Sequence, residues 1–212
     1  IFFLRQFYKQ DYNLKPTIII SSSAKITNQY LLSFFLPYLN LVISEKKFYN
    51  FQEVVENTKV PLELALPYNN VYYPWEIAIN YINQDNMISS FNYFKLSEKD
   101  ESYGYKILQN FGISKKDWFV VLHVREGGFK GIYSYEHDFR NADIHDYEFC
   151  INEIIKRGGK VVRVGDKTMK PIKNIKHCYD YAHSEFKSDF MDVFLAAKCA
   201  FCIGTSSGYY SL

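Results

Sequence analysis

The second half of the chain alternates short apolar runs with amphipathic helical patterns, and this alternation limits the fold more than any other feature. The runs are rich in Val, Ile, Phe or Tyr, which is typical of buried β-strands. They are WFVVLHV (118–124), KVVRVG (160–165), IKHCYDYA (175–182) and AFCI (200–203). Strands that alternate with helices indicate a parallel sheet, because a parallel connection needs a long crossover. We therefore expect an α/β fold.

Three helices are expected around these strands, each beginning at a residue suited to an N-cap. The first has Ser97 followed three residues later by Asp100, which favours a helix start, and it ends at Gly112. The other two are DIHDYEFCINEIIKRGG (143–159), capped by Asp143, and SDFMDVFLAAK (188–198), capped by Ser188 or Asp189.

The first half predicts a second α/β unit. A strand, a helix and another strand are expected over TIII (17–20), TNQYLLSFFL (27–36) and LNLVI (39–43), followed by an amphipathic helix over 44–57. Residues 60–76 hold three of the six prolines and predict a loop, with a further helix over 76–83. The pattern weakens around residues 85–97. We place a domain boundary there, which gives domains 1–96 and 97–212.

The composition is that of a soluble globular protein, with 48% apolar and 23% charged residues among 212. A net charge of +2 without a Lys/Arg block argues against a nucleic-acid partner. The longest apolar run is interrupted by Pro37 and Asn40, so no transmembrane segment is expected. No signal peptide is visible either.

The four cysteines follow no secreted disulfide pattern and predict reduced thiols in a cytoplasmic protein. Two of them form a CxxC that lacks a second pair, so a zinc site is the weaker alternative. They are Cys150, Cys178, Cys199 and Cys202.

Polar residues and glycines gather where the predicted strands end. In an open parallel sheet, ligands bind in the crevice outside the carboxyl edge, where all these strand ends meet. The strand ends carry His123 and Arg125, then Arg163, Gly165 and Asp166, then Asp180 and Ser184, and finally Gly204, Thr205, Ser206 and Ser207. For Arg163, within VVRV in the middle of a strand, a buried ion pair is the simplest explanation.

The GTSSG stretch (204–208) has two interpretations. Its glycines permit a sharp turn and its hydroxyls donate hydrogen bonds, which suits a phosphate or diphosphate at the start of a following helix. A strand-to-helix turn with a Ser N-cap explains the same residues and is the commoner case. The stretch is neither a Walker loop, since the lysine is absent, nor a G-x-G-x-x-G fingerprint.

His123 and Arg125 are two residues apart on a strand and so belong to one side of it. Arginine grips phosphate through two hydrogen bonds, and histidine donates a hydrogen bond or moves a proton. The alternative is an ordinary strand end with an ion-paired Arg125. In FRNADI, Arg140 is a second candidate anion ligand, whereas Asn141 suits a turn and Asp143 an N-cap.

These motifs in this order resemble a bacterial family assigned as glycosyltransferases from sequence alone. They are similar, more loosely, to the fucosyltransferase and protein O-fucosyltransferase superfamily. The resemblance covers residues 97–212 and rests on FVVLHVREGGF, FRNADI, GGKVVRVGD and DYAHSEFKSDFMDVFLAAKCAFCIGTSSG. The superfamily shares an H-x-R at the first strand of this domain. It also shares a helix with Asp192, Leu195 and Cys199 that leads into the Thr/Ser-rich loop.

The resemblance implies a GT-B architecture, in which two Rossmann-like domains with parallel sheets bind acceptor and nucleotide sugar. It implies no metal ion or other cofactor, because positive side chains and a helix N-terminus neutralise the departing nucleoside diphosphate. By position, Arg125 would contact the diphosphate, His123 would line the site and Thr205, Ser206 and Ser207 would bind phosphate. Asp180 and Ser184 would lie near the nucleotide or sugar, whereas Arg140, Asn141 and Asp143 match a family motif of unassigned role.

The candidate catalytic residues are then His123, Arg125 and Asp180. The base that takes the acceptor proton is not assigned: a carboxylate of the first half or Glu126 fits this role, and His123 is a weaker candidate. The implied acceptor is a hydroxyl of a glycan, a lipid-linked glycan or a protein. These acceptors fit a cytoplasmic enzyme of surface polysaccharide or glycoconjugate synthesis. Peripheral association of the enzyme with the inner membrane is compatible with this function.

The family domain continues beyond GTSSG, so we expect this chain to be a fragment with an incomplete C-terminal domain. Two other functions fit parts of the pattern. A non-catalytic module that binds nucleotides or phosphosugars uses the same anion site, and a zinc hydrolase would use His123 with Asp and Cys ligands at poor spacing.

Overall fold

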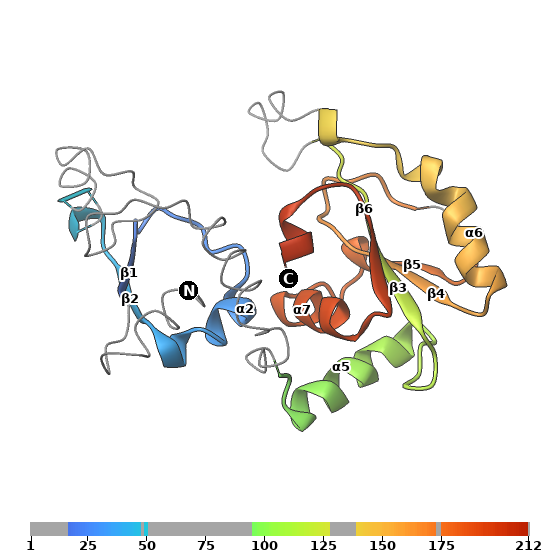
Figure 1. Cartoon of the computed structure of the whole chain (residues 1–212), viewed down its shortest axis with the longest axis horizontal. Coiled ribbons are helices and arrows are strands. Elements are labelled where there is room, and N and C mark those ends of the chain that lie inside the picture. Colours follow the sequence, from blue (N-terminus) through green and yellow to red (C-terminus); the bar gives the residue numbers. More distant parts are fainter. Residues whose placement is uncertain (1–16, 48, 51–94, 128–138, 173–174, 212) are drawn as a thin grey trace, which may run out of the picture. The chain divides into compact units, whose positions relative to one another are not determined.

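The computed structural model describes residues 17–47, 49–50, 95–127, 139–172 and 175–211. The chain divides into two compact units, Ile1–Lys95 and Leu96–Leu212, which are described separately (Figure 1). The loop predicted over 60–76 and the helix predicted over 76–83 lie outside the described residues, as does most of the helix predicted over 44–57.

The first unit contains a pair of parallel strands, as the sequence predicts. β1 (Thr17–Ile20) pairs with β2 (Asn40–Ile43), and Ile18 lies opposite Leu41. The connection includes α2 (Gln29–Ser33) and a 3₁₀ turn, η1 (Leu36–Tyr38), with Pro37 at its start. Proline suits the first turn of a helix, because its missing N–H would have no partner there.

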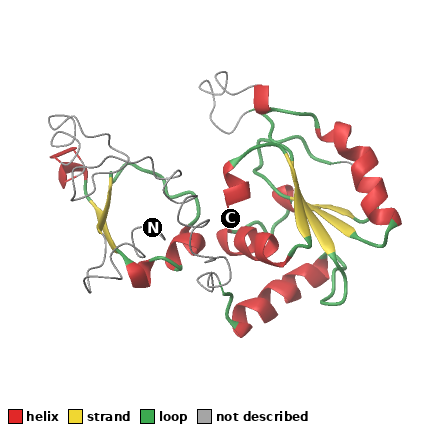
Figure 2. Ribbon diagram, in the orientation of Figure 1, coloured by secondary structure: helices red, strands yellow, loops and turns green. Residues whose placement is uncertain are grey.

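The second unit is a four-stranded parallel sheet with helices on both faces (Figure 2). The strands are β3 (Phe119–His123), β4 (Lys160–Arg163), β5 (Cys178–Asp180) and β6 (Phe201–Gly204), and their order across the sheet is β5-β4-β3-β6. β6 therefore returns to the far side of the first strand of the unit. Numbered along the chain, the order is 3-2-1-4, as at the centre of a doubly wound, Rossmann-like sheet.

The three predicted helices of this unit are confirmed. α5 (Glu98–Asn110) begins at Ser97, whose hydroxyl accepts the N–H of Asp100, and α7 (Asp189–Lys198) begins at Ser188, which accepts the N–H of Met191. The middle helix differs from the prediction. Asp143 caps a 3₁₀ turn, η4 (Ile144–Tyr147), and only then does α6 (Glu148–Lys156) begin.

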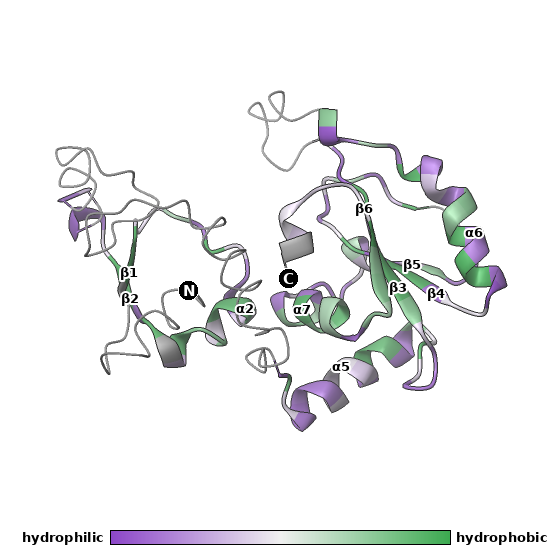
Figure 3. Cartoon of the chain, in the orientation of Figure 1, coloured by the Kyte–Doolittle hydropathy of each residue, from purple (hydrophilic) through white to green (hydrophobic). Residues whose placement is uncertain are grey.

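The helices cover the sheet unequally. α6 packs on one face, whereas α5 and α7 contact each other on the opposite face (Figure 1). Gly104 permits this contact, because a Cβ at residue 104 would overlap the ring of Phe194. The hydrophobic residues of this unit concentrate on the strands and on the sides of the helices that face them (Figure 3). The core on the α6 face consists of Val120, Leu122, Val124, Ile144, Ile151, Ile154 and Val161.

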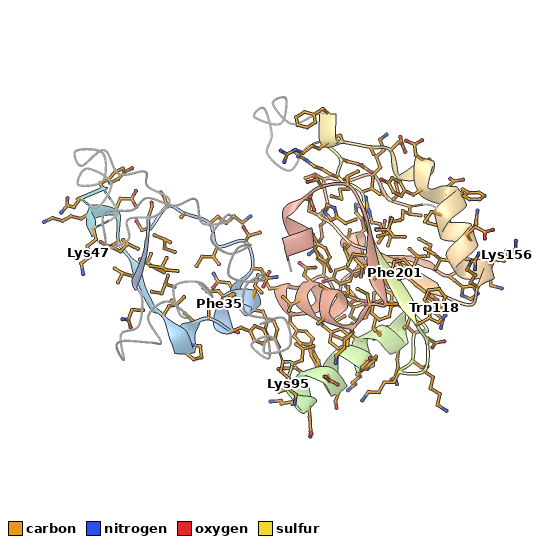
Figure 4. All side chains as sticks on the ribbon, viewed as in Figure 1. Phe35, Lys47, Lys95, Trp118, Lys156 and Phe201 are labelled. Atoms are coloured by element: carbon orange, nitrogen blue, oxygen red, sulfur yellow. The ribbon has the colours of Figure 1, made fainter. Side chains whose placement is uncertain are left out.

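The two ends of the sheet differ in character. Trp118 and Phe201, labelled in Figure 4, lie at the amino ends of β3 and β6, where both rings are partly exposed. The opposite, carboxyl ends carry His123 and Arg163, the two polar residues that are buried within the described parts of the chain. Charge and hydrogen-bonding capacity are therefore concentrated at the carboxyl edge. Within the described residues, no helix combines the length and apolar character needed to cross a bilayer.

Candidate functional site

The register of the sheet brings the predicted strand ends together. Asp180 pairs with Arg163 and Arg163 with Leu122, while on the other side of β3 His123 pairs with Gly204. The carboxyl edge thus presents two groups of polar residues, one at β3 and β6 and the other at β4 and β5. Both groups come from the strand ends that the sequence singles out.

The GTSSG loop is fastened to the end of β3. The N–H of Thr205 donates to the carbonyl of His123 at 3.0 Å, and the hydroxyl of Thr205 accepts the N–H of Arg125 at 2.7 Å. Gly204, the last residue of β6, has φ of 148°, a backbone conformation that residues other than glycine rarely adopt. These two hydrogen bonds fix the backbone of Arg125 beside the loop. Ser206 is exposed.

His123 is buried at the junction of β3 and the loop, with 8% of its surface exposed. Its Nδ1 lies 3.2 Å from the hydroxyl of Ser207, and its ring stacks on Tyr209. Burial lowers the pKa of His123, and the nearby positive charges of Arg163 and Arg125 lower it further. At neutral pH the imidazole is therefore uncharged, which suits a hydrogen-bonding role better than direct neutralisation of an anion.

Arg125 is half-buried, and no carboxylate of the described residues pairs with it. Within the described parts of the chain, its guanidinium has neither an ion pair nor a hydrogen bond, although its backbone is fixed by Thr205. The ion pair of the alternative interpretation is not found among the described residues. A guanidinium in this state retains all five N–H donors for a ligand.

Arg163 belongs to the other group, and both of its terminal nitrogens have partners, whereas its Nε has none among the described residues. Its side chain is 0% exposed, and Nη1 donates to Oδ1 of Asp180 at 2.9 Å. Nη2 donates to the carbonyl of Lys170 at 2.9 Å and lies 3.7 Å from Oε1 of Glu126. The predicted buried ion pair is confirmed, but Arg163 is the last residue of β4 rather than a mid-strand residue. Paired carboxylates compensate the cost of burying its charge.

The loop after β4 folds back onto this group. Oε2 of Glu126 accepts the N–H of Lys170 at 2.6 Å, and Oδ2 of Asp180 accepts the N–H of Ile172 at 3.0 Å. Gly165 begins the loop with φ of 148°. Asp166 accepts the N–H of Thr168 at 2.8 Å, so its carboxylate serves the turn itself. Glu126, one of the candidate bases, is committed here to holding a backbone segment.

The FRNADI residues play mostly local roles. Asp143 accepts the N–H of His145 at 3.0 Å as the N-cap of η4 and binds Nζ of Lys170 at 3.1 Å. These hydrogen bonds hold the pKa of Asp143 below its ordinary value. Arg140 is exposed and lies over the ring of its neighbour Phe139, and Asn141 is half-buried. Ser184, at the β5 end, donates to the carbonyl of Tyr181 at 2.9 Å.

Two residues of the site were missed by sequence reasoning. Tyr209 stacks on His123, and His183 lies in a 3₁₀ turn, η5 (Tyr181–His183), directly after β5. Nδ1 of His183 is 2.9 Å from Oδ2 of Asp180. The spacing of three residues between Asp180 and His183 was the available signal, since a turn brings such side chains together.

The cysteines are free thiols and half-buried. Burial raises the pKa of both Cys178 and Cys199 to about 12, and Sγ of Cys199 lies 3.5 Å from Sγ of Cys202. Across the described residues, no group of three or more His, Cys, Asp or Glu side chains is placed to hold a metal ion.

Comparison with known proteins adds no assignment. No protein-family model, no curated protein and no solved structure matches this chain. The similarity of residues 97–212 to glycosyltransferases therefore stays a prediction. What the structure does establish is an α/β protein with parallel sheets and a polar carboxyl edge.

Proposed function

We propose that this protein is a glycosyltransferase that moves a sugar from a nucleotide-sugar donor to an acceptor hydroxyl. The donor diphosphate would lie at the carboxyl ends of β3 and β6, between Arg125 and the loop Gly204–Ser207. The observation that carries the proposal is the strand order β5-β4-β3-β6.

This order creates a topological switch point between β3 and β6. From β3 the chain crosses one face of the sheet through α6 toward β4 and β5, and it returns across the other face through α7 to β6, on the opposite side of β3 (Figure 1). Crossover connections that reverse direction in this way leave a crevice outside the carboxyl ends, and open α/β sheets bind their ligands there. His123, Arg125 and the GTSSG loop are the residues that border this point.

The chemistry of these residues suits a diphosphate. The guanidinium of Arg125 has no partner among the described residues and its backbone is fixed by Thr205, while Ser206 adds an exposed hydroxyl. In transfer, the acceptor oxygen would attack the anomeric carbon while the bond to the diphosphate oxygen breaks. The positive charge of Arg125 would stabilise the negative charge that develops on the leaving group. The reaction would then require no metal ion or other cofactor.

The wider architecture belongs to the same proposal. Residues 97–212 would form the nucleotide-sugar domain of a GT-B enzyme, and residues 1–96 the acceptor-side domain. The acceptor would be a glycan, a lipid-linked glycan or a protein.

Thermal denaturation tests the donor site directly. A nucleoside diphosphate that binds only the folded protein raises its stability by about 2.7 kcal/mol at a concentration of 100 times Kd. We expect UDP, GDP or ADP to raise the melting temperature, with EDTA present to remove divalent cations. Arg125→Ala should abolish the shift without lowering the melting temperature of the unliganded protein. Arg157→Ala, an exposed arginine on the α6 side, is the matched control and should retain the shift.

Two results would count against the proposal. If UDP, GDP, ADP and the corresponding nucleotide sugars all leave the melting curve unchanged, the proposed donor site is wrong. A shift without turnover for any acceptor would favour the alternative function, a binding module for nucleotides or phosphosugars.

A further inference from the structure

His183 forms a side-chain pair with Asp180 at the same edge of the sheet. It lies directly after β5, its side chain is 24% exposed, and its Nδ1 is 2.9 Å from Oδ2 of Asp180. Partial exposure distinguishes it from His123, which is buried. An imidazole beside a fixed carboxylate at a ligand-binding edge is a common arrangement for proton transfer.

The contacts decide which nitrogen of His183 carries the proton. Asp180 is a carboxylate and only accepts, so the short contact requires a proton on Nδ1. Nη1 of Arg163 donates one N–H to Oδ1 of Asp180 at 2.9 Å and also lies 3.3 Å from Nδ1. With the proton on Nδ1, that nitrogen cannot accept an N–H of Arg163, so its hydrogen bond is the one to Asp180. In the neutral ring, Nε2 then holds a lone pair.

Asp180 itself is held from two directions. Oδ1 accepts from Arg163, and Oδ2 accepts the N–H of Ile172 at 3.0 Å in addition to its contact with His183. These bonds fix the plane of the carboxylate. Asp180 is therefore suited to orient the imidazole and to stabilise the imidazolium that forms on protonation. Glu126 is a further charged group near this pair and faces Arg163.

The Nε2 atom of His183 is available to a ligand. Within the described residues, the only hydrogen-bond partners of the His183 ring lie at Nδ1. The register places Asp180 two strands from Leu122, the neighbour of His123, which is about 10 Å at about 4.8 Å per strand. A diphosphate at Arg125 with its sugar extending along the edge toward β5 would cover a distance of this order.

We propose that His183 is the base that accepts the proton of the attacking hydroxyl, with Asp180 as the residue that positions it. This inference rests on the proposed function and supplies the group that it leaves open. The acceptor O–H bond breaks and its proton moves to Nε2 of His183. The acceptor oxygen forms the new bond to the anomeric carbon, and the diphosphate leaves with the electron pair of the broken bond. The imidazolium, held by Asp180, later releases its proton to water.

The first test separates binding from chemistry. His183→Gln should retain the melting shift caused by the active nucleoside diphosphate, because Arg125 and Thr205 are unchanged. Release of that diphosphate from its nucleotide sugar, with mono- and oligosaccharides as acceptors, should lose about 10²- to 10⁴-fold in kcat with little change in KM for the donor. His145→Gln is the control, since its Nδ1 also faces a carboxylate, Asp143, but its side chain is 62% exposed. This variant should keep the full rate.

The second test needs no substrate. Long-range ¹H–¹⁵N NMR of the unliganded wild-type protein should show His183 in the tautomer with the proton on Nδ1. Asp180→Asn should lower kcat and reduce the population of that tautomer. If Asp180→Asn unfolds, the tautomer of the wild-type protein and the turnover rate of His183→Gln still decide whether His183 is the base.

The outcomes distinguish this inference from the proposed function. A full rate in His183→Gln, or a proton on Nε2 in the wild-type protein, overturns the role of His183 and leaves the donor site intact. If no nucleotide shifts the melting curve of the wild-type protein, the proposed function fails and the role of His183 in glycosyl transfer fails with it. Three results together support the proposed function and the role of His183: His183→Gln still binds the nucleoside diphosphate, it loses turnover, and the wild-type His183 carries its proton on Nδ1.

Discussion

The imidazole of His123 and the phenol ring of Tyr209 stack nearly parallel, with 10° between their planes and 5.7 Å between their centroids. The hydroxyl of Tyr209 donates to the carbonyl of Asp192 at 2.9 Å, which anchors the ring to α7. The stack covers one face of the imidazole and contributes to the burial of His123. Burial lowers the pKa of His123, which makes it a poor proton acceptor.

This burial predicts a pH dependence of stability. The folded pKa of His123 lies below the ordinary value of 6.5, so below about pH 6.5 the unfolded chain takes up a proton that the folded protein does not. The free energy of unfolding should therefore fall as the pH drops from 6.5 toward the folded pKa. Urea denaturation at pH 7.5 and 5.5 measures this loss. It should be smaller in His123→Gln than in the wild-type protein, and an equal loss in both would contradict the prediction.

Replacement of Arg163 should be costly even without any ligand. Arg163→Met keeps the length of the side chain but leaves the carboxylates of Asp180 and Glu126 without their shared cation. Breaking a buried ion pair by removing one partner typically costs about 3–5 kcal/mol. Chemical denaturation checks this value. Arg157→Met, in an exposed pair with Glu153, should stay within about 0.5 kcal/mol of the wild-type protein.

Thr205 offers a test of how the loop positions Arg125. Thr205→Val has nearly the same shape but removes the hydroxyl that accepts the N–H of Arg125. The part-buried N–H then lacks a partner, which costs about 1–3 kcal/mol of stability. We also expect a smaller melting shift with the nucleoside diphosphate. Thr205→Ser keeps the acceptor and should behave like the wild-type protein; if Ser and Val are equally affected, the methyl group matters and the hydrogen bond does not.

Gly104 should resist substitution although it lies inside a helix. Alanine there gains helix propensity, about 1 kcal/mol, but its Cβ would overlap the ring of Phe194 in α7. Overpacking of this kind typically costs about 1–3 kcal/mol, so the net effect should be destabilising. In a double-mutant cycle measured by denaturation, Gly104→Ala should be tolerated better when Phe194 is replaced by Leu. Independent, additive effects would show that the two residues do not compete for space.

Local patterns predicted the elements of the second unit well. The N-caps Ser97 and Ser188 and the stop at Gly112 depend on residues within one or two helical turns, so the sequence contains the whole signal. The strand ends were equally accessible, because an apolar run stops where polar residues begin. The 3₁₀ turn after Asp143 was not predicted, since its cap residue suits either kind of helix.

The pairing of side chains across strands was not predictable. Arg163 finds Asp180 only because β4 lies next to β5, and strand order depends on contacts between distant segments. The carbonyl of Lys170 joins this group through a loop that no periodic pattern describes. For the same reason, the sequence did not predict that the site divides into two groups. In one, the hydroxyl of Thr205 holds the backbone of Arg125; in the other, Arg163 pairs with Asp180.

The return of β6 to pair with β3, on the side away from β4, also has a consequence for the order of folding. β3, α6 and β4 are close in sequence, whereas the bond between the Arg125 N–H and the Thr205 hydroxyl joins residues 80 positions apart. Closing such a long loop costs more chain entropy than forming the local contacts, so β6 should dock last. In pulsed hydrogen exchange during refolding, the amides of Cys202 and Ile203 should gain protection after those of Val161 and Val162. The cluster around Arg163 would then form before the loop Gly204–Ser207 is fixed beside Arg125, and the proposed diphosphate site would be assembled only when β6 docks.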